Sequence, residues 1–188
     1  MGDLMKIDEA FEAVDRANFV PKELRRSVDI DAPLPIGYGQ TNSQPYTVRK
    51  MLQWLGAQPG EKVLDVGSGS GWTTALLAYL VGPKGQVYAV ERVPELVDFG
   101  RENAEGAGVK NARFFTAGDE FGLPEEGPYE RILVIASADE LPQELVDQLK
   151  VSGKMVIPVY EDILEITKKS AGDLDIKKHP GFVFVPLI

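Results

Sequence analysis

The sequence predicts an α/β protein with a doubly wound, Rossmann-like sheet that is mostly parallel and carries antiparallel strands at its C-terminal edge. Short apolar strands alternate with helical segments of about 8 to 14 residues through the middle of the chain. A glycine-rich turn connects the first of these strands to a helix. The last apolar segments have no helix between them, which is typical of antiparallel strands.

The individual elements follow from apolar periodicity and from turn residues. Segment 7–14 has the apolar spacing of a short amphipathic helix, and helical spacing returns at 46–55. Between them, Pro21, Pro33 and Pro35 predict an extended, irregular segment. We expect core strands at 62–66, 86–90, 112–116, 131–135 and 154–159, core helices at 73–81, 94–107 and 142–149, and closing strands at 163–168 and 182–186.

The chain of 188 residues has the length of one domain with a single core. We expect three parts within it. Residues 1–58 form a helical and loop lid, residues 59–159 form the cofactor-binding core, and residues 160–188 form the C-terminal strands. Parallel strands covered by helices on both faces are apolar on both faces, and segment 62–66 fits that pattern.

Composition excludes several classes of function. The chain has no cysteine and one histidine, His179, so we expect no disulfide, no thiolate chemistry and no metal site. A net charge of −9 disfavours nucleic acid as a partner. No apolar run approaches the roughly 20 residues of a membrane helix, and the N-terminus lacks the pattern of a signal peptide. We therefore expect a cytoplasmic monomer that does not contact a membrane.

The glycine-rich turn lies in segment 63–72, VLDVGSGSGW. Gly67 and Gly69 allow positive φ angles and a close approach of a ligand to the backbone, and the next helix points its amide groups at that ligand. The dinucleotide fingerprint would need glycine where this chain has Trp72. Asp65, in the strand before the turn, suits a cationic amino-acid ligand better than a pyrophosphate. The turn favours S-adenosylmethionine, and an NAD-dependent oxidoreductase is the weaker alternative.

Two further acidic positions agree with a nucleoside ligand. Glu91 ends the second core strand, where a carboxylate accepts hydrogen bonds from ribose hydroxyls. Asp119 follows the third core strand and could bind the adenine amino group. Because the carboxyl ends of parallel strands meet at one edge of the sheet, we expect the turn, Glu91 and Asp119 to form one site.

Segment 33–46, PLPIGYGQTNSQPY, is the most distinctive part of the chain. It resembles the P-L-P-I-G-x-G-Q-T-I-S-x-P stretch of the protein-L-isoaspartate O-methyltransferases, which are S-adenosylmethionine-dependent enzymes. Similarity extends from Phe19, Val20 and Pro21 through the glycine-rich turn to the C-terminal F-V-P-L, and so covers nearly the whole chain.

The resemblance implies methyl transfer from S-adenosyl-L-methionine to the carboxylate of L-isoaspartyl or D-aspartyl residues in damaged proteins, which begins their repair. It implies that Ser43 is catalytic and that the substrate peptide lies near Thr41, Tyr46, Val185 and Pro186. The expected cofactor-binding residues combine those of the glycine-rich turn, the acidic positions and the segment that resembles the family. They are Gln40, Thr41, Ser43, Asp65, Gly67, Ser68, Gly69, Glu91, Arg92, Asp119 and Glu120.

The chemistry of this reaction agrees with the composition. A carboxylate with an ordinary pKa near 4 is already ionised at neutral pH, so methyl transfer to it needs no general base. The protein has to align the carboxylate with the methyl carbon and exclude water. The hydroxyl of Ser43 can orient one carboxylate oxygen while the other oxygen attacks.

The sequence departs from the family pattern in four places. Asn42 replaces an apolar residue between Thr41 and Ser43, Glu120 replaces a glycine, and segment 135–138 differs from the usual Thr-Ala-Ala type. The chain also begins without a full N-terminal helix pair and stops soon after Pro186. These departures leave two alternatives open: a methyltransferase of the same fold acting on another carboxylate or peptide, and a cofactor-binding protein without catalysis.

Overall fold

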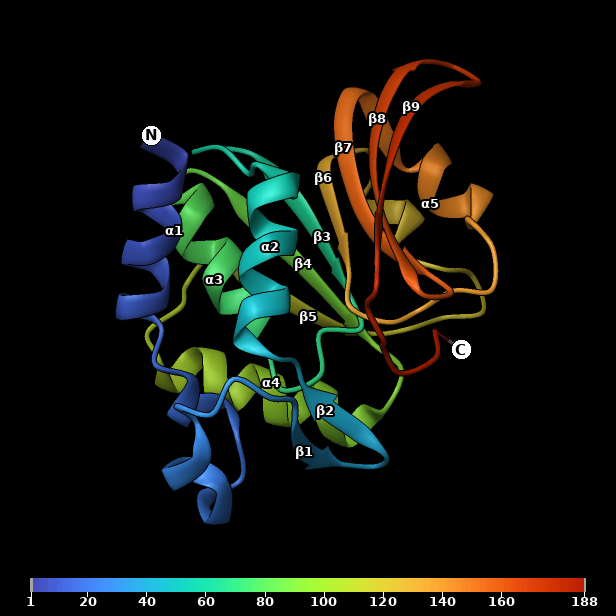
Figure 1. Cartoon of the computed structure of the whole chain (residues 1–188). Helices are drawn as coiled ribbons and strands as arrows, with labels where there is room; N and C mark the ends of the chain where they lie inside the picture. Colours follow the sequence, from blue (N-terminus) through green and yellow to red (C-terminus); the bar gives the residue numbers. More distant parts are fainter. Residues whose placement is uncertain (1, 188) are drawn as a thin grey trace.

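A seven-stranded sheet runs through the computed structural model, which describes residues 2–187 (Figure 1). Its strands are β3 (Lys62–Val66), β4 (Gln86–Glu91), β5 (Ala112–Thr116), β6 (Tyr129–Val134), β7 (Leu149–Val159), β8 (Asp162–Ser170) and β9 (Asp173–Pro180). The strand order is β5-β4-β3-β6-β7-β8-β9. Strands β3 to β7 pair in parallel, whereas β8 and β9 are antiparallel additions. The predicted fold class is confirmed.

The order of the strands locates the ligand site. From β3 the chain first builds outward through β4 to β5, and then returns to place β6 on the other side of β3. The point between β3 and β6 is therefore a topological switch point, where open α/β sheets bind ligands beyond the carboxyl ends of their strands.

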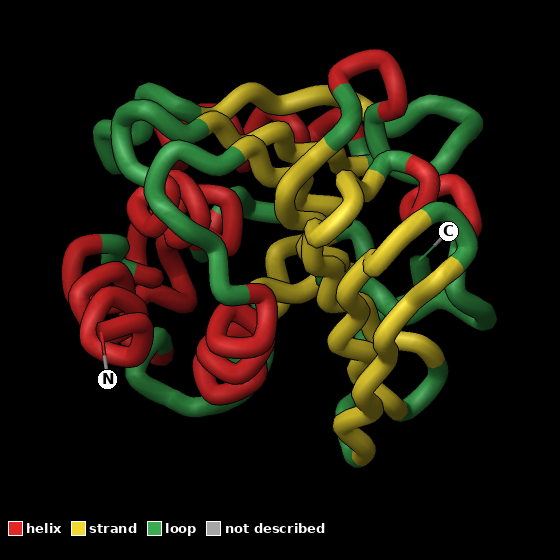
Figure 2. Tube along the Cα trace, turned by 90° about the horizontal axis from the view of Figure 1, so that it is seen from above, coloured by secondary structure: helices red, strands yellow, loops and turns green. Residues whose placement is uncertain are grey.

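Helices cover both faces of this sheet. They are α1 (Gly2–Ala13), α2 (Pro45–Leu55), α3 (Trp72–Val81), α4 (Pro94–Gly106) and α5 (Gln143–Asp147), with short 3-10 turns at Arg16–Phe19, Lys22–Ser27 and Pro124–Glu126. One apolar core joins α1, α2 and α3 to the sheet, and another joins α5 to the opposite face (Figures 1 and 2). Neighbouring residues of β3 divide between the cores, Val63 in the first and Leu64 in the second, as the pleat requires.

Two predictions near the C-terminus were wrong. The helix expected at 142–149 is only α5, because Leu149 already pairs with Tyr129 at the start of the longer strand β7. The strand expected at 182–186 is instead β9, at Asp173–Pro180, and Pro186 makes only an isolated bridge to Ser137. Most side chains of β9 are exposed on both faces, so its sequence lacks the apolar alternation that identifies a strand.

The segment expected to be irregular contains a hairpin of β1 (Leu34–Gly37) and β2 (Gln40–Asn42). Its tip has positive φ angles at Gly37, Tyr38 and Gly39, of 92°, 55° and 74°. Glycine at two of these positions makes so tight a reversal accessible. The hairpin lies at the end of the molecule where β3 and β4 end (Figure 1).

Among residues 2–187, no helix combines the length and the apolar character needed to cross a membrane.

Candidate active site

A cavity of about 480 Å³ lies at the carboxyl edge of the sheet. Its floor comes from the ends of β3, β4, β5 and β6, so it occupies the switch point of the strand order. The hairpin forms one wall through Gln40 and Thr41, and the C-terminal tail forms another through Val185, Pro186 and Leu187. Segments that are far apart in the sequence, from Gln40 to Leu187, therefore meet around one space.

The glycine-rich turn enters this cavity directly from β3. Gly67, Gly69 and Gly71 have φ angles of 78°, 51° and 84°, and the amide of Gly67 donates to the carbonyl of Val90 at 2.9 Å. A Cβ on Gly71 would lie 2.7 Å from the carbonyl oxygen of Gly100 in α4. The third glycine thus allows α4 to pack closely against the turn, which explains why a glycine at 71 is needed.

Glu91 closes the turn from the neighbouring strand and is 8% exposed. Its Oε2 accepts from the amide of Gly69 at 3.0 Å, and its Oε1 accepts from the amide of Val93 at 2.9 Å. A carboxylate has about four acceptor positions, so each oxygen keeps one for a ligand. Glu91 is therefore held rigidly at the cavity wall with capacity left for two hydroxyl groups.

Asp65 is fully buried beneath the turn. Its Oδ2 accepts from the hydroxyls of Thr73 and Thr74, at 2.8 and 2.6 Å. Its Oδ1 and the Oγ of Ser68 are the two buried side-chain polar atoms without a hydrogen-bond partner in the described part of the chain. Burial raises the pKa of Asp65 to about 6; Glu91 also raises it, whereas the two hydroxyls lower it.

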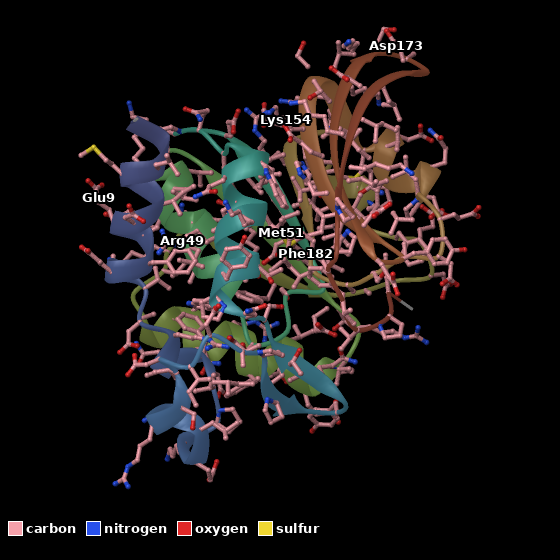
Figure 3. The ribbon with its side chains drawn as sticks, viewed as in Figure 1. Glu9, Arg49, Met51, Lys154, Asp173 and Phe182 are labelled. Atoms are coloured by element: carbon pink, nitrogen blue, oxygen red, sulfur yellow. The ribbon has the colours of Figure 1, made fainter. Side chains whose placement is uncertain are left out.

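Backbone hydrogen bonds at two places hold the C-terminal tail, residues 181–187, against the cavity. The amides of Gly181 and Phe182 donate to the carbonyl of Glu161, and Phe182 packs on the same core as Met51 of α2 (Figure 3). Beyond this point the amide of Ser137 donates to the carbonyl of Val185 at 2.8 Å. This backbone contact at the end of β6 holds the tail against the cavity.

Most residues expected from the sequence do come together. The large cavity is lined by Gln40, Thr41, Gly67, Gly69, Glu91, Arg92, Asp119, Glu120, Val185 and Pro186. Thr41, Ser43 and Ser68 line a smaller hollow of about 20 Å³, which shares Gly67, Gly69 and Ile135 with the large cavity. Asp65 lies below the surface of both hollows.

Tyr46 also lines neither hollow, and unlike the buried Asp65 it lies at the surface. Its side chain is 51% exposed, its amide donates to Asp31 at 2.8 Å, and its ring faces Lys50. A role for Tyr46 therefore requires a substrate peptide that extends beyond the cavity, and this role stays a prediction.

The apolar part of the cavity wall was not predicted from the sequence. Phe121 follows Asp119 and Glu120 on the wall, and Gln148 fixes this segment. The Nε2 of Gln148 donates to the carbonyl of Phe121 at 2.8 Å, and its Oε1 accepts from the amide of Leu123 at 2.9 Å. An aromatic residue directly after the acidic pair was the available signal, since an adenine ring needs apolar surface as well as polar contacts.

Comparisons with known proteins identify the family of the chain. The family described as Protein-L-isoaspartate(D-aspartate) O-methyltransferase (PCMT) matches residues 3–188. Protein-L-isoaspartate O-methyltransferases of Aeropyrum pernix and Pyrococcus horikoshii are 48% and 45% identical to the chain. Each alignment covers 97% of this chain, and 72% and 84% of the respective relative.

A solved structure from Plasmodium falciparum, assigned to the same family and in complex with S-adenosyl-L-homocysteine, superimposes with a TM-score of 0.85. It is 31% identical, and the match covers 97% of this chain and 90% of that one. The predicted family is confirmed: the chain belongs to the protein-L-isoaspartate O-methyltransferases, which are S-adenosylmethionine-dependent methyltransferases.

Proposed function

We propose that this chain methylates the carboxylate of L-isoaspartyl or D-aspartyl residues in damaged proteins, with S-adenosylmethionine as the methyl donor. The observation that carries the proposal is the meeting of three parts around one cavity. The glycine-rich turn with Glu91 suits a nucleoside, the hairpin brings Thr41 and Ser43 beside that turn, and the C-terminal tail supplies an open wall for a peptide.

The chain's own residues fit this cofactor. S-adenosylmethionine, when bound, supplies an electrophilic methyl group on a sulfonium. The free acceptor positions of Glu91 suit the ribose hydroxyls, and Asp119 with Phe121 suits the adenine. Asp65 Oδ1 and Ser68 Oγ are buried without partners, a state that costs about 1–3 kcal/mol for each group, and an ammonium group would relieve that cost.

The acceptor side of the site requires orientation rather than proton transfer. We assign Ser43 the role of donating a hydrogen bond to one oxygen of the substrate carboxylate, which leaves the other oxygen free to attack. A neutral hydroxyl suits this role, because a cation would stabilise the charged carboxylate in the ground state more than in the transition state. The substrate backbone would lie along Val185 and Pro186 at the mouth of the cavity.

A direct assay tests the proposed function. The chain is incubated with S-adenosylmethionine and either an isoaspartyl peptide or the same peptide with normal aspartate. We expect S-adenosylhomocysteine and a 14-dalton mass increase with the isoaspartyl peptide alone. Cofactor binding without methyl transfer to that peptide would contradict the proposal. A screen of other carboxylates and of D-aspartyl peptides would then separate another acceptor from loss of catalysis.

The raised pKa of Asp65 predicts that cofactor affinity depends on pH. With a pKa of about 6 in the free protein, Asp65 is mostly protonated at pH 5 and mostly ionised at pH 7. An ammonium ligand prefers the ionised form, so binding releases a proton below pH 6. We expect the affinity for S-adenosylhomocysteine to rise about tenfold from pH 5 to pH 7.

Calorimetry in buffers of different ionisation enthalpy measures both the affinity and the proton release. Asp65→Asn should bind more weakly and lose the pH dependence over this range. An Asp65→Asn variant with the same pH dependence as the wild type would assign the titration to another group.

The remaining inferences concern the cellular setting. We propose that the protein acts as a monomer in the cytoplasm, since a repair enzyme has to accept many different damaged proteins at an open site. Size-exclusion chromatography with light scattering, with and without a bound peptide, measures the oligomeric state.

A further inference from the structure

A buried arginine lies behind the hairpin that carries Thr41 and is followed directly by Ser43. Arg16 is 6% exposed, and within the described residues no carboxylate lies close enough to form an ion pair with it. Burial lowers its pKa to about 10, which still leaves it charged at neutral pH. The ring of Trp72, the first residue of α3, lies 5.2 Å from the guanidinium carbon.

Hydrogen bonds from Arg16 converge on the hairpin and on the loop before it. The guanidinium donates to the carbonyls of Asn42 and Ser43 at 3.3 and 3.0 Å, and its Nε donates to Asn42 Oδ1 at 2.7 Å. Further bonds of 2.8 to 3.1 Å reach the carbonyls of Val28, Ile30 and Ala32. Arginine has five N–H donors, so its whole donor capacity is used: the two NH2 groups hold backbone carbonyls, and Nε holds the side chain of Asn42.

Asn42 continues this network to the glycine-rich turn. The side chain is 3% exposed, and its Nδ2 donates to the Oγ of Ser70 at 3.1 Å. The carbonyl of Ser70 in turn accepts from Asn103 of α4 at 3.1 Å. One amide therefore connects the arginine, the hairpin and the turn, and an apolar residue at position 42 could make neither bond.

We propose that Asn42, held by Arg16, is a positioning residue that fastens the hairpin to the glycine-rich turn and thereby sets the distance between Ser43 and the methyl donor. The inference rests on the proposed function for its catalytic consequence. Asn42 is the last residue of β2, so its bonds to Arg16 and Ser70 fix the end of the strand from which Ser43 follows. Thr41, Asn42 and Ser43 all line the smaller hollow beside Gly67 and Gly69.

The positioning has a measurable kinetic consequence. Asn42→Leu keeps the branching of the side chain but leaves Arg16 Nε and Ser70 Oγ without their partner. A displacement of about 1 Å in a reacting group can cost up to about a hundredfold in rate. We expect kcat to fall on the order of tenfold, while the affinity for S-adenosylhomocysteine changes less than about threefold, because Glu91 and Asp65 remain in place.

A conservative variant separates positioning from general damage. In Asn42→Asp, one carboxylate oxygen can accept from Arg16 Nε and the other can accept from the hydroxyl of Ser70, whose hydrogen rotates freely. We expect this variant to regain most of the wild-type kcat. Ser70→Ala removes only the far end of the network, and its effect on kcat should not add to that of Asn42→Leu.

Asn111→Leu is the matched control. Its Nδ2 donates to the carbonyls of Ala78 and Gly82 at 3.0 and 2.9 Å, but it precedes β5 at the opposite edge of the sheet. The same change in chemistry there should lower the melting temperature and leave kcat unchanged. If kcat fell in both leucine variants, a general loss of stability would explain the effect at Asn42. That result would overturn the proposal.

Hydrogen exchange gives a readout that does not depend on activity. Asn42→Leu should accelerate exchange in segments 40–44 and 67–71 together, and Asn111→Leu should not. If the wild type fails to methylate isoaspartyl peptides but this paired change occurs, the proposed function is rejected and the structural link stands. A folded Asn42→Leu variant with unchanged exchange and unchanged kcat would reject the link itself.

Discussion

Glu91→Ala is expected to weaken the binding of S-adenosylhomocysteine by about a hundredfold. Hydrogen bonds to charged groups contribute about 1.5–3 kcal/mol each, and the loss of roughly 3 kcal/mol corresponds to about two orders of magnitude in affinity. The variant removes the acceptor positions that face the cavity. It also removes the acceptors for the amides of Gly69 and Val93, so the turn loses support at the same time.

Two further variants make this result specific. Glu91→Gln has nearly the same size, but its NH2 group would face the amide of either Gly69 or Val93, so we expect it to bind almost as weakly as the alanine variant. Glu95→Ala changes an exposed carboxylate in the first turn of α4 and should bind normally. Calorimetry measures all three, and normal affinity in Glu91→Ala would remove this residue from the cofactor site.

Ser43→Ala is expected to lower kcat for an isoaspartyl peptide by about a hundredfold and to change cofactor affinity only little. The hydroxyl is assigned to hold the carboxylate in line with the methyl carbon, and a misplacement of about 1 Å can cost about a hundredfold in rate. The substitution is well suited to test the hydroxyl alone. Arg16 binds the backbone carbonyl of Ser43, so the loop keeps its anchor when the side chain is shortened.

Steady-state kinetics with saturating S-adenosylmethionine separates kcat from the KM of the peptide. Ser170→Ala, at the exposed end of β8, provides the control for serine truncation away from the site. A Ser43→Ala enzyme with wild-type kcat would show that the hydroxyl does not orient the acceptor, and would transfer that role to another group on the hairpin or the tail.

Local sequence patterns were sufficient for the elements that have a strong apolar signature. Strands β3 and β5 have the predicted bounds. β3 is buried on both faces from Val63 to Val66, and β5 carries two adjacent phenylalanines between turn residues, so both segments stand out in the sequence. Strand β9 has mostly exposed side chains and exists because β8 offers it a partner. Strands β1 and β2 likewise depend on pairing with each other, across a turn of positive φ angles.

Some residues of the candidate site could be predicted from the sequence, and others could not. Residues at the end of a strand or soon after it, such as Gly67, Glu91 and Asp119, could be placed from sequence because the carboxyl ends of parallel strands meet at one edge. Phe121 and the buried contacts of Asn42 could not, since hydrogen bonds across 26 and 28 residues depend on how the hairpin folds back.

The amino-acid sequence by itself determined the fold class, the family and the identity of the cofactor, because these depend on periodicity and on short motifs within contiguous segments. Only the tertiary structure decided that Tyr46 lies outside the cavity, that Asp65 is buried with one free oxygen, and that Arg16 and Asn42 connect the hairpin to the turn. These features depend on which polar groups are buried by segments distant in the sequence. Tertiary packing determines that burial, and local sequence does not.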